Sequence, residues 1–223
     1  MGDTVLIVVA HPDDEVLGVG GTVAWHAARD DVVHSLILGE GEASRGTSTR
    51  VARRRQAGLR QAAAKAAAEL GAQEPLFRTY PDNRFDTVPL LSIVQDIEKT
   101  ITAVRPTIVY THHSGDLNVD HRVTYAAVLT ACRPQPASLV RTMLTFETVS
   151  SSEWGAAFQP RLFIDIEKHL GTKRRALAHY RAEMRAFPHA RSLENVEALA
   201  RHRGATAGLK AAEAFDVVRS ILV

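Results

Sequence analysis

The sequence predicts an α/β fold in which helices cover both faces of a mostly parallel sheet. Two observations predict it. Short apolar segments rich in β-branched residues alternate with longer segments whose apolar residues recur at helical spacing. Clusters of polar residues follow several of the expected strands, and an open parallel sheet binds its ligands at that end. The chain has 223 residues, enough for a substantial core, so we expect residues 1–223 to form a single domain.

The first half of the chain begins with residues 4–10, TVLIVVA, which are apolar on both faces and predict a central parallel strand. Residues 17–29 have apolar side chains at helical spacing despite three glycines, which we expect to allow close packing. Residues 32–38, VVHSLIL, predict a second strand that is followed by a polar loop. Residues 50–70 are rich in Ala, Arg, Gln and Leu and predict a helix that Gly71 caps.

The second half continues the alternation. The expected elements are a strand at 75–80, a PDNR turn, a helix at 90–104, a strand at 107–111, a helix at 119–131 and strands at 139–146 and 161–166. From Glu167 onward we expect mostly helix. Strands that alternate with helices indicate a parallel sheet covered on both faces, and no repeat or linker divides the chain.

Composition and charge exclude several classes of protein. The formal net charge is +2 and no basic stripe with interleaved aromatic residues occurs, so we expect no nucleic-acid partner. No apolar stretch reaches about 18 residues, so we expect no membrane span. Cys132 is the only cysteine, which excludes an intramolecular disulfide. The first residues do not have the pattern of a signal peptide, and we therefore expect a cytoplasmic protein.

The motif AHPDDE, residues 10–15, predicts a metal site at the end of the first strand. Imidazole and carboxylate groups are suited to Zn²⁺ or a similar divalent cation. His11 and Asp14 lie three residues apart and can close on one ion, which leaves Asp13 free to handle protons. Glu15 competes poorly as a ligand, and we expect it to cap backbone amides or to support His11.

A second polar cluster, HHSGDLNVDH at residues 112–121, can complete this site. A zinc hydrolase usually has three protein ligands and keeps one position for water. His121 is the best candidate for the third ligand because it begins the helix that follows the fourth strand. Asp116 and Asp120 can orient imidazoles. By itself the cluster is equally typical of a helix N-terminus with exposed histidines; the metal hypothesis depends on its combination with AHPDDE.

With these motifs, the chain resembles the LmbE-like superfamily, also called the PIG-L family, of zinc-dependent N-deacetylases. AHPDDE is the specific motif, and NVDH, RRRQA at 53–57, ELG at 69–71, PDN at 81–83 and RGATAGLKAAEAF at 203–215 follow in the family's order. The resemblance implies a Rossmann-like three-layer fold and a metal bound by His11, Asp14 and His121, with Asp13 as general base. It also implies an N-acetylated sugar or glycoconjugate as substrate and allows a homo-oligomer.

The sequence departs from the family pattern at one catalytic position. Many members have HPDH where this chain has NVDH, so Asn118 replaces a histidine that assists the oxyanion or the leaving group. Asn118 can donate a hydrogen bond but cannot carry a proton at neutral pH. His113 or Asp116 can substitute in that role, which stays open. Gln56 also replaces an acid of the RxxEA pattern.

Substrate contacts are less specific in the sequence. Arginines on the rim of the second loop can bind substrate oxygens, although a solvated surface explains them equally well. PDN can bond sugar hydroxyls but is also an ordinary turn, and PHARS can close the site or simply join two helices. The candidates are Arg45, Arg53, Asp82, Asn83, His189 and Arg191. Two alternatives to a deacetylase remain: an amidase acting on another C–N bond, such as a thiol conjugate, and a metal-binding protein without activity.

Overall fold

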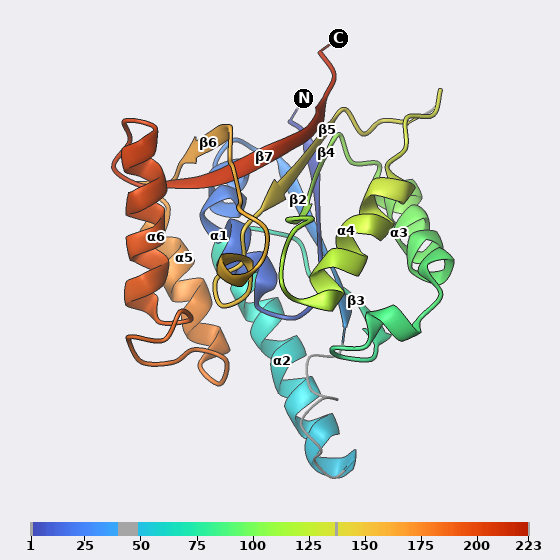
Figure 1. Cartoon of the computed structure of the whole chain (residues 1–223), viewed down its shortest axis with the longest axis horizontal. Helices are drawn as coiled ribbons and strands as arrows, with labels where there is room; N and C mark the ends of the chain where they lie inside the picture. The colour runs from blue at the N-terminus through green and yellow to red at the C-terminus, as the bar shows by residue number, and fades with distance from the viewer. Residues whose placement is uncertain (1, 40–48, 137, 223) are drawn as a thin grey trace.

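The computed structural model describes residues 2–39, 49–136 and 138–222. Within these ranges one sheet of seven strands has the order β3-β2-β1-β4-β5-β7-β6 (Figure 1). The strands are β1 (Thr4–Val9), β2 (Val32–Gly39), β3 (Leu76–Tyr80), β4 (Ile108–His112), β5 (Thr142–Phe146), β6 (Leu162–Asp165) and β7 (Ala212–Ser220). Strands β1 to β5 pair in parallel, whereas β7 runs antiparallel to β5 and β6. The predicted α/β class with a mostly parallel sheet is confirmed.

Helices cover both faces of this sheet (Figure 1). The α-helices are α1 (Asp14–Ala27), α2 (Thr49–Leu70), α3 (Leu90–Val104), α4 (Val119–Ala131), α5 (Leu170–Leu177) and α6 (Leu193–Thr206). The short 3₁₀ helices are η2 (Phe85–Thr87), η3 (Ser152–Trp154) and η4 (Ala178–Tyr180). None of the helices in the described ranges combines the length and apolar character that crossing a membrane requires.

Strand β1 lies in the interior of the sheet, between β2 and β4, and divides the core into two layers. Successive side chains of a strand point to opposite faces, so Val5, Ile7 and Val9 pack with α1 and α2 while Leu6 and Val8 pack with α3 and α4. All five are buried. This explains why the segment is apolar throughout: both of its faces are covered.

The element boundaries agree with the sequence to within one residue except in three places, one of which is β5, which begins at Thr142 and not at the predicted Leu139. Helices α3 and α4 have the predicted bounds, and Gly71 ends α2 with a positive φ of 77°. Helix α1 begins at Asp14, three residues before the predicted start, because the metal motif itself forms its first turn. The expectation of a mostly helical tail is wrong at its end: after α5 and α6, the chain forms β7. Val217 and Val218 and an alternating pattern are the strand signals there.

The strand order also determines where a ligand can bind. Strand β1 pairs with β2 on one side and with β4 on the other, so the chain leaves β1 and β4 in opposite directions across the sheet. Open α/β sheets bind ligands at such a point, beyond the carboxyl ends of the strands. The loop after β1 contains the AHPDDE motif and the loop after β4 contains HHSGDLNVDH. The predicted convergence of these two loops is confirmed; the loop after β2, residues 40–48, lies outside the described residues.

Candidate functional site

The turn that follows β1 has a strained residue at its centre. Asp13 has a φ of 109°, a left-handed conformation that side chains other than glycine rarely adopt. Its backbone N–H donates to Oε2 of Glu15 at 3.0 Å, and the hydroxyl of Tyr180 donates to Oε1 of the same carboxylate. Burial raises the pKa of Glu15 to about 8, against the opposing effect of the Tyr180 hydrogen bond. Glu15 therefore caps a backbone amide of this turn, which is one of the two roles predicted for it.

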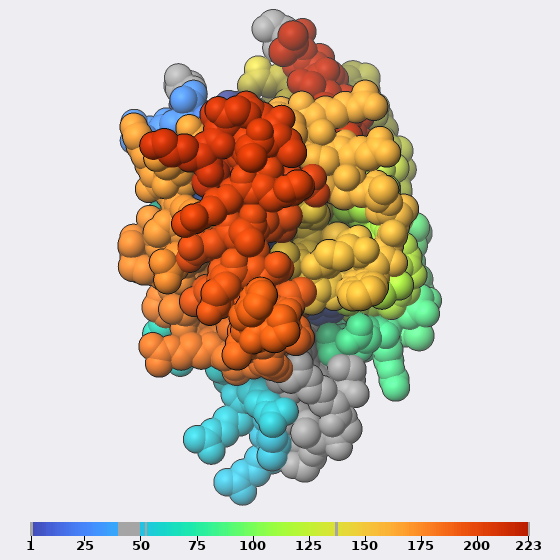
Figure 2. All heavy atoms as spheres, turned by 60° about the vertical axis from the view of Figure 1, so that its left-hand side comes forward, coloured from blue at the N-terminus to red at the C-terminus, as the bar shows by residue number. Residues whose placement is uncertain are grey.

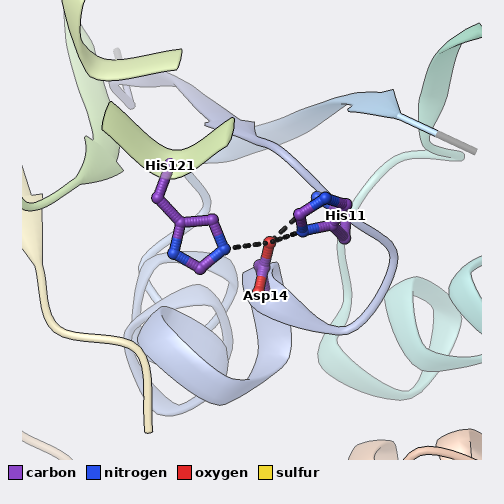
Figure 3. A group of neighbouring side chains, drawn as sticks. All are labelled: His11, Asp14 and His121. Atoms are coloured by element: carbon purple, nitrogen blue, oxygen red, sulfur yellow. Dashed lines mark hydrogen bonds and ion pairs between the residues drawn. The ribbon is translucent and has the colours of Figure 1, made fainter. Parts of the chain in front are cut away.

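Three predicted ligands meet beside this turn (Figure 3). Oδ2 of Asp14 lies 3.4 Å from Nδ1 of His11 and 3.3 Å from Nε2 of His121. One potential ligand atom from each residue lies within 4.8 Å of those of the other two. His11 comes from the loop after β1, Asp14 from the first residue of α1 and His121 from the first turn of α4. The chain thus brings together donors that are more than a hundred residues apart.

The donor set fits a divalent cation. Oδ1 of Asp14 and Nε2 of His121 are buried, and neither has a hydrogen-bond partner among the described residues. Buried polar atoms are nearly always paired, so a His121 Nε2 that makes no hydrogen bond with these residues although it lies 3.3 Å from Oδ2 of Asp14 points to a ligand position at these two residues. Two imidazoles and one carboxylate are also the usual ligand types of a catalytic zinc site. These residues therefore form a candidate metal centre.

His11 is oriented by carboxylates on its other side. Its Nε2 lies 2.9 Å from Oδ2 of Asp120 and 3.2 Å from Oδ1 of Asp82. Asp120 also accepts hydrogen bonds from the backbone N–H groups of Asn83 and Phe85, which ties the PDN turn to the metal centre. Burial alone lowers the pKa of His11, but the hydrogen bonds to Asp120 and Asp14 outweigh it and raise that pKa to about 10. Asp120 orients an imidazole, as predicted.

His121 is held in a similar way by Asp116. Its Nδ1 lies 3.2 Å from Oδ1 of Asp116, whose Oδ2 accepts hydrogen bonds from the hydroxyls of Ser151 and Ser152 at 3.0 and 2.6 Å. Burial raises the pKa of Asp116, but these bonds and the His121 charge lower it to about 2. Burial lowers the pKa of His121, yet the charge of Asp14 and the bond to Asp116 raise it overall. Asp116 therefore supports a ligand and does not reach the pocket.

His112 is a neighbour whose role the sequence did not reveal. Its ring stacks on that of His121, with centroids 3.8 Å apart and planes 9° apart. Nε2 of His112 accepts the backbone N–H of Ala10 at 3.0 Å, so its lone pair is already used. Burial and the charge of His121 lower the pKa of His112 to about 3, which keeps the ring neutral. It is a support for the metal centre and not a fourth ligand.

Asp13 is paired with an arginine from the C-terminal part of the chain. Nη1 of Arg191 donates to Oδ2 of Asp13 at 2.6 Å, and Nε of Arg191 donates to the hydroxyl of Ser150 at 2.8 Å. Oδ1 of Asp13 is buried without a hydrogen-bond partner in the described ranges. Burial raises the pKa of Asp13 to about 7, although the Arg191 charge opposes it. Arg191 therefore holds one oxygen of this carboxylate, while the other makes no hydrogen bond with the described residues.

A cavity of about 390 Å³ opens beside Asp13. In the space-filling view, the dark blue of the N-terminal segment is visible in a hollow between green, yellow and orange surfaces (Figure 2). The lining is predominantly polar and comes from six segments of the chain: His11, Pro12, Asp13, Leu59, Asp82, Asn83, Asn118, Ser150, Glu183, Arg185, His189 and Arg191. The predicted substrate residues Asp82, Asn83, His189 and Arg191 are among them. Ser150, Glu183 and Arg185 were not predicted, because no motif surrounds them.

Other predicted residues lie elsewhere. Nε2 of His113 faces the backbone carbonyl of Ala156 at 3.2 Å, and this residue does not line the cavity. Arg53 is exposed on α2 and is also absent from the lining, while Arg45 lies outside the described residues. Asn118 lines the cavity and caps α4, since its Oδ1 accepts the backbone N–H of Asp120 at 2.8 Å. Of the groups considered for assisting the oxyanion, only Asn118 faces the cavity among the described residues.

Comparison with known proteins agrees with this geometry. The sequence model of the family described as PIG-L, GlcNAc-PI de-N-acetylase, matches residues 6–132, which contain both motifs of the metal centre. The protein described as uncharacterized deacetylase YaiS of Escherichia coli (strain K12) is 27% identical over 183 residues, which are 80% of this chain and 90% of that protein.

Two solved structures have the same fold. The N,N'-diacetylchitobiose deacetylase of Pyrococcus horikoshii superposes with a TM-score of 0.80 at 17% identity, over 97% of this chain and 84% of that chain. GalB, the 4-carboxy-2-hydroxymuconate hydratase of Pseudomonas putida KT2440, has a TM-score of 0.81 at 22% identity, over 99% of this chain and 98% of that chain. At these identities the likeness concerns the fold, which serves more than one reaction in its known examples.

Proposed function

This chain belongs to the PIG-L family of de-N-acetylases, and we propose that its deacetylase activity removes the N-acetyl group of an amino sugar or a sugar conjugate with the help of Zn²⁺. His11, Asp14 and His121 would hold the metal. The observation that carries the proposal is the state of Asp13: Arg191 holds its Oδ2, while its buried Oδ1 has no partner in the described part of the chain and lies next to the candidate metal centre.

Asp13 is suited to be the general base. A base must present an unoccupied lone pair to the attacking water, and Oδ1 meets that requirement. The left-handed backbone conformation of Asp13 turns this residue away from helix α1, which begins at Asp14. The two adjacent carboxylates therefore have different surroundings: Asp14 faces the two imidazoles, and Asp13 faces the cavity. Once protonated, Asp13 can return the proton to the departing amine. The same residue would then act first as base and afterwards as acid.

The remaining steps need polarisation of the acetyl carbonyl. When bound, Zn²⁺ supplies Lewis acidity that activates a water molecule and polarises a carbonyl oxygen. Asn118 lines the cavity, and its Nδ2 can donate a hydrogen bond to that oxygen as negative charge develops on it. This nitrogen lies 3.5 Å from Oδ1 of Asn83, so the amide group is already held in place. Asn118 would therefore stabilise charge without transferring a proton.

The cavity supports a sugar as the substrate. Its volume of about 390 Å³ lies in the range of small-molecule sites. The amide of Asn83, the hydroxyl of Ser150 and the carboxylates of Asp82 and Glu183 line it, and such groups form hydrogen bonds with sugar hydroxyls. The guanidinium of Arg191 is engaged by Asp13, so the cavity is not a simple cationic site for phosphate.

A substrate screen with acetate release as the readout tests this proposal. The zinc-loaded protein would be incubated with N-acetyl sugars that are free, nucleotide-linked or lipid-linked, and with acylated thiol conjugates of amino sugars. Asp13→Asn serves as the control, because asparagine tolerates the left-handed conformation. We expect acetate from at least one N-acetyl sugar with the native protein and none with the control.

The outcomes separate the alternatives. Cleavage of thiol conjugates without deacetylation of any N-acetyl sugar would favour an amidase acting on another C–N bond. Tight zinc binding with no hydrolysis of any amide would favour a protein that binds metal without activity. Equal acetate release by the native protein and by Asp13→Asn would remove Asp13 from the mechanism.

A further inference from the structure

A buried ion pair lies against helix α1, and neither of its residues lines the cavity. Nζ of Lys173 in α5 and Oε1 of Glu213 in β7 are 2.6 Å apart, and the two side chains are only 4% and 5% exposed. Burying two charges is unfavourable unless further hydrogen bonds satisfy them. The partners of this pair therefore indicate what it does.

Those partners are backbone groups of α1. Nζ of Lys173 donates to the carbonyl oxygen of Leu17 at 2.8 Å, and Oε1 of Glu213 accepts the N–H of Gly21 at 2.9 Å. An uninterrupted α-helix would join this carbonyl and this N–H directly. Oε2 of Glu213 also accepts the N–H of Thr22 at 2.7 Å. The ion pair therefore takes the place of the backbone hydrogen bond that would join Leu17 and Gly21 in a continuous helix.

Helix α1 is broken at this place. Val19 has a φ of −134° and a ψ of 16°, which are not helical angles. The break divides α1 into a short segment that begins at Asp14 and a longer segment that contains Gly21 and Thr22. A cation at the C-terminal end of the first segment and an anion at the N-terminal end of the second complement the dipoles of both. The ion pair therefore stabilises the broken geometry.

Three glycines allow the broken helix to pack closely against its neighbours. A Cβ atom added to Gly18 would lie 2.2 Å from the ring of Phe146, and one added to Gly21 would lie 2.7 Å from Ile166. One added to Gly20 would lie 3.2 Å from Cγ of Lys173 itself. The glycines thus let both segments approach the sheet and α5 more closely than any side chain would allow.

We propose that Lys173 and Glu213 are positioning residues of the metal centre, which orient the first segment of α1 and with it Asp14. This inference rests on the proposed metal-dependent function. The segment is held by β1 at its N-terminal end, by the hydrogen bond from Tyr180 to Glu15, and by Lys173 at its C-terminal end. If the support at the C-terminal end is lost, the segment can shift and change the position of Asp14 relative to His11 and His121, which other elements hold.

Two neutral variants, Glu213→Gln and Lys173→Met, test the proposal. Lys210→Met is the matched control, because Lys210 also lies 2.6 Å from a carboxylate, that of Glu167, but is exposed. Zinc affinity is measured by competition with a chelating dye, the folded fraction by circular dichroism, and kcat and KM separately on an N-acetyl sugar. We expect zinc affinity to fall about tenfold in both neutral variants, with kcat reduced more than KM is raised, and no change in Lys210→Met.

Each outcome decides the question. Native zinc affinity in folded Glu213→Gln and Lys173→Met would overturn the proposal and leave the pair a role in stability alone. If neither folds, the double variant Lys173→Met/Glu213→Gln removes both charges and leaves no unpaired buried ion; a native zinc affinity in that variant would likewise overturn the proposal. Zinc affinity needs no substrate, so weakened zinc binding in a protein that deacetylates nothing would reject the proposed reaction and uphold the positioning role.

Discussion

Nη1 of Arg191 donates a hydrogen bond of 2.6 Å to Oδ2 of Asp13, across 178 residues of sequence. The contact joins the loop after β1 to the segment that precedes α6. It also distinguishes the two oxygens of one carboxylate, because Oδ1 has no hydrogen-bond partner in the ranges that the structure describes. A substrate that enters the cavity would therefore meet a carboxylate, that of the proposed base, whose orientation is already determined.

Asp13→Asn should abolish most hydrolysis while zinc remains bound. Asparagine has the same size and tolerates the φ of 109° at this position, but its amide cannot accept the proton of the attacking water. Loss of a general base reduces kcat by about 10²- to 10⁴-fold. Zinc content by elemental analysis and acetate release measure the two effects in one sample. An enzyme that loses its zinc on this substitution would place Asp13 among the ligands.

Arg191→Met should lower kcat and leave KM nearly unchanged. The arginine holds the base, so its loss lets Asp13 turn away from the water, and small misplacements of this kind reduce rates by up to about a hundredfold. Arg185→Met is the matched control: Arg185 also lines the cavity, but it donates to the backbone carbonyls of Ala182 and Met184. Steady-state kinetics on the substrate found in the screen measure both parameters. A raised KM with native kcat would return Arg191 to the substrate-binding role that its sequence position suggested.

His121→Ala should lose tightly bound zinc, whereas His113→Ala should retain it. His121 presents an unpartnered Nε2 to Asp14, and His113 points to the carbonyl of Ala156. The two histidines belong to the same ten-residue cluster, so the pair of variants compares position rather than residue type. Zinc content after dialysis against a weak chelator gives the result. Stoichiometric zinc in His121→Ala would reject the third ligand.

His26 should make the protein less stable as the pH falls. Its Nδ1 lies 2.7 Å from Oδ2 of Asp31 and its Nε2 lies 2.9 Å from the Tyr110 hydroxyl, an arrangement that suits a neutral ring. Burial lowers the pKa of His26 below its ordinary value of 6.5, although Asp31 and Asp3 oppose the shift and Arg29 adds to it. The unfolded chain therefore binds more protons than the folded one, and the free energy of unfolding decreases as the pH falls below 6.5.

Urea unfolding at about pH 5.5 and about pH 7.5 measures this effect. The control is His26→Gln, which has no titrating group at position 26. All other groups are shared, so the difference between the two pH slopes belongs to His26. The native protein should lose more stability between the two pH values than the variant does. Equal slopes would show that His26 takes up its proton as readily in the folded protein as in the unfolded chain.

The candidate ligands and the inner strands could be brought together from the sequence because their signals are local. AHPDDE places two candidate ligands and the proposed base within four residues, at the end of a strand that is apolar on both faces. His121 could be added because parallel strands bring their following loops to one edge. Long periodic helices such as Leu90–Val104 were predicted to the residue for the same reason: their pattern is complete within the segment.

Features that depend on distant partners could not be predicted in this way. The break in α1 reflects the packing of Gly18 against Phe146 and of Gly21 against Ile166; the glycines indicated close packing, but the sequence did not identify their partners. Strand β7 adds to the sheet between β5 and β6, which only tertiary pairing determines. Arg191 was selected as a substrate residue from a loop motif, but its partner in the structure is Asp13, the proposed base.

Asn118→Asp separates the two roles of Asn118. Aspartate caps a helix as well as asparagine does, so the hydrogen bond from the Asp120 amide to position 118 should persist and stability should change little. The carboxylate cannot donate, however, and it places negative charge where the proposed oxyanion develops. The loss of one such donor reduces kcat by about 10²- to 10³-fold. Kinetics and urea unfolding of Asn118→Asp, with Asn118→Ser as a variant that keeps both a cap and a donor, measure the two roles independently. Native kcat in Asn118→Asp would show that Asn118 only caps α4 and that the acetyl oxygen is stabilised without it.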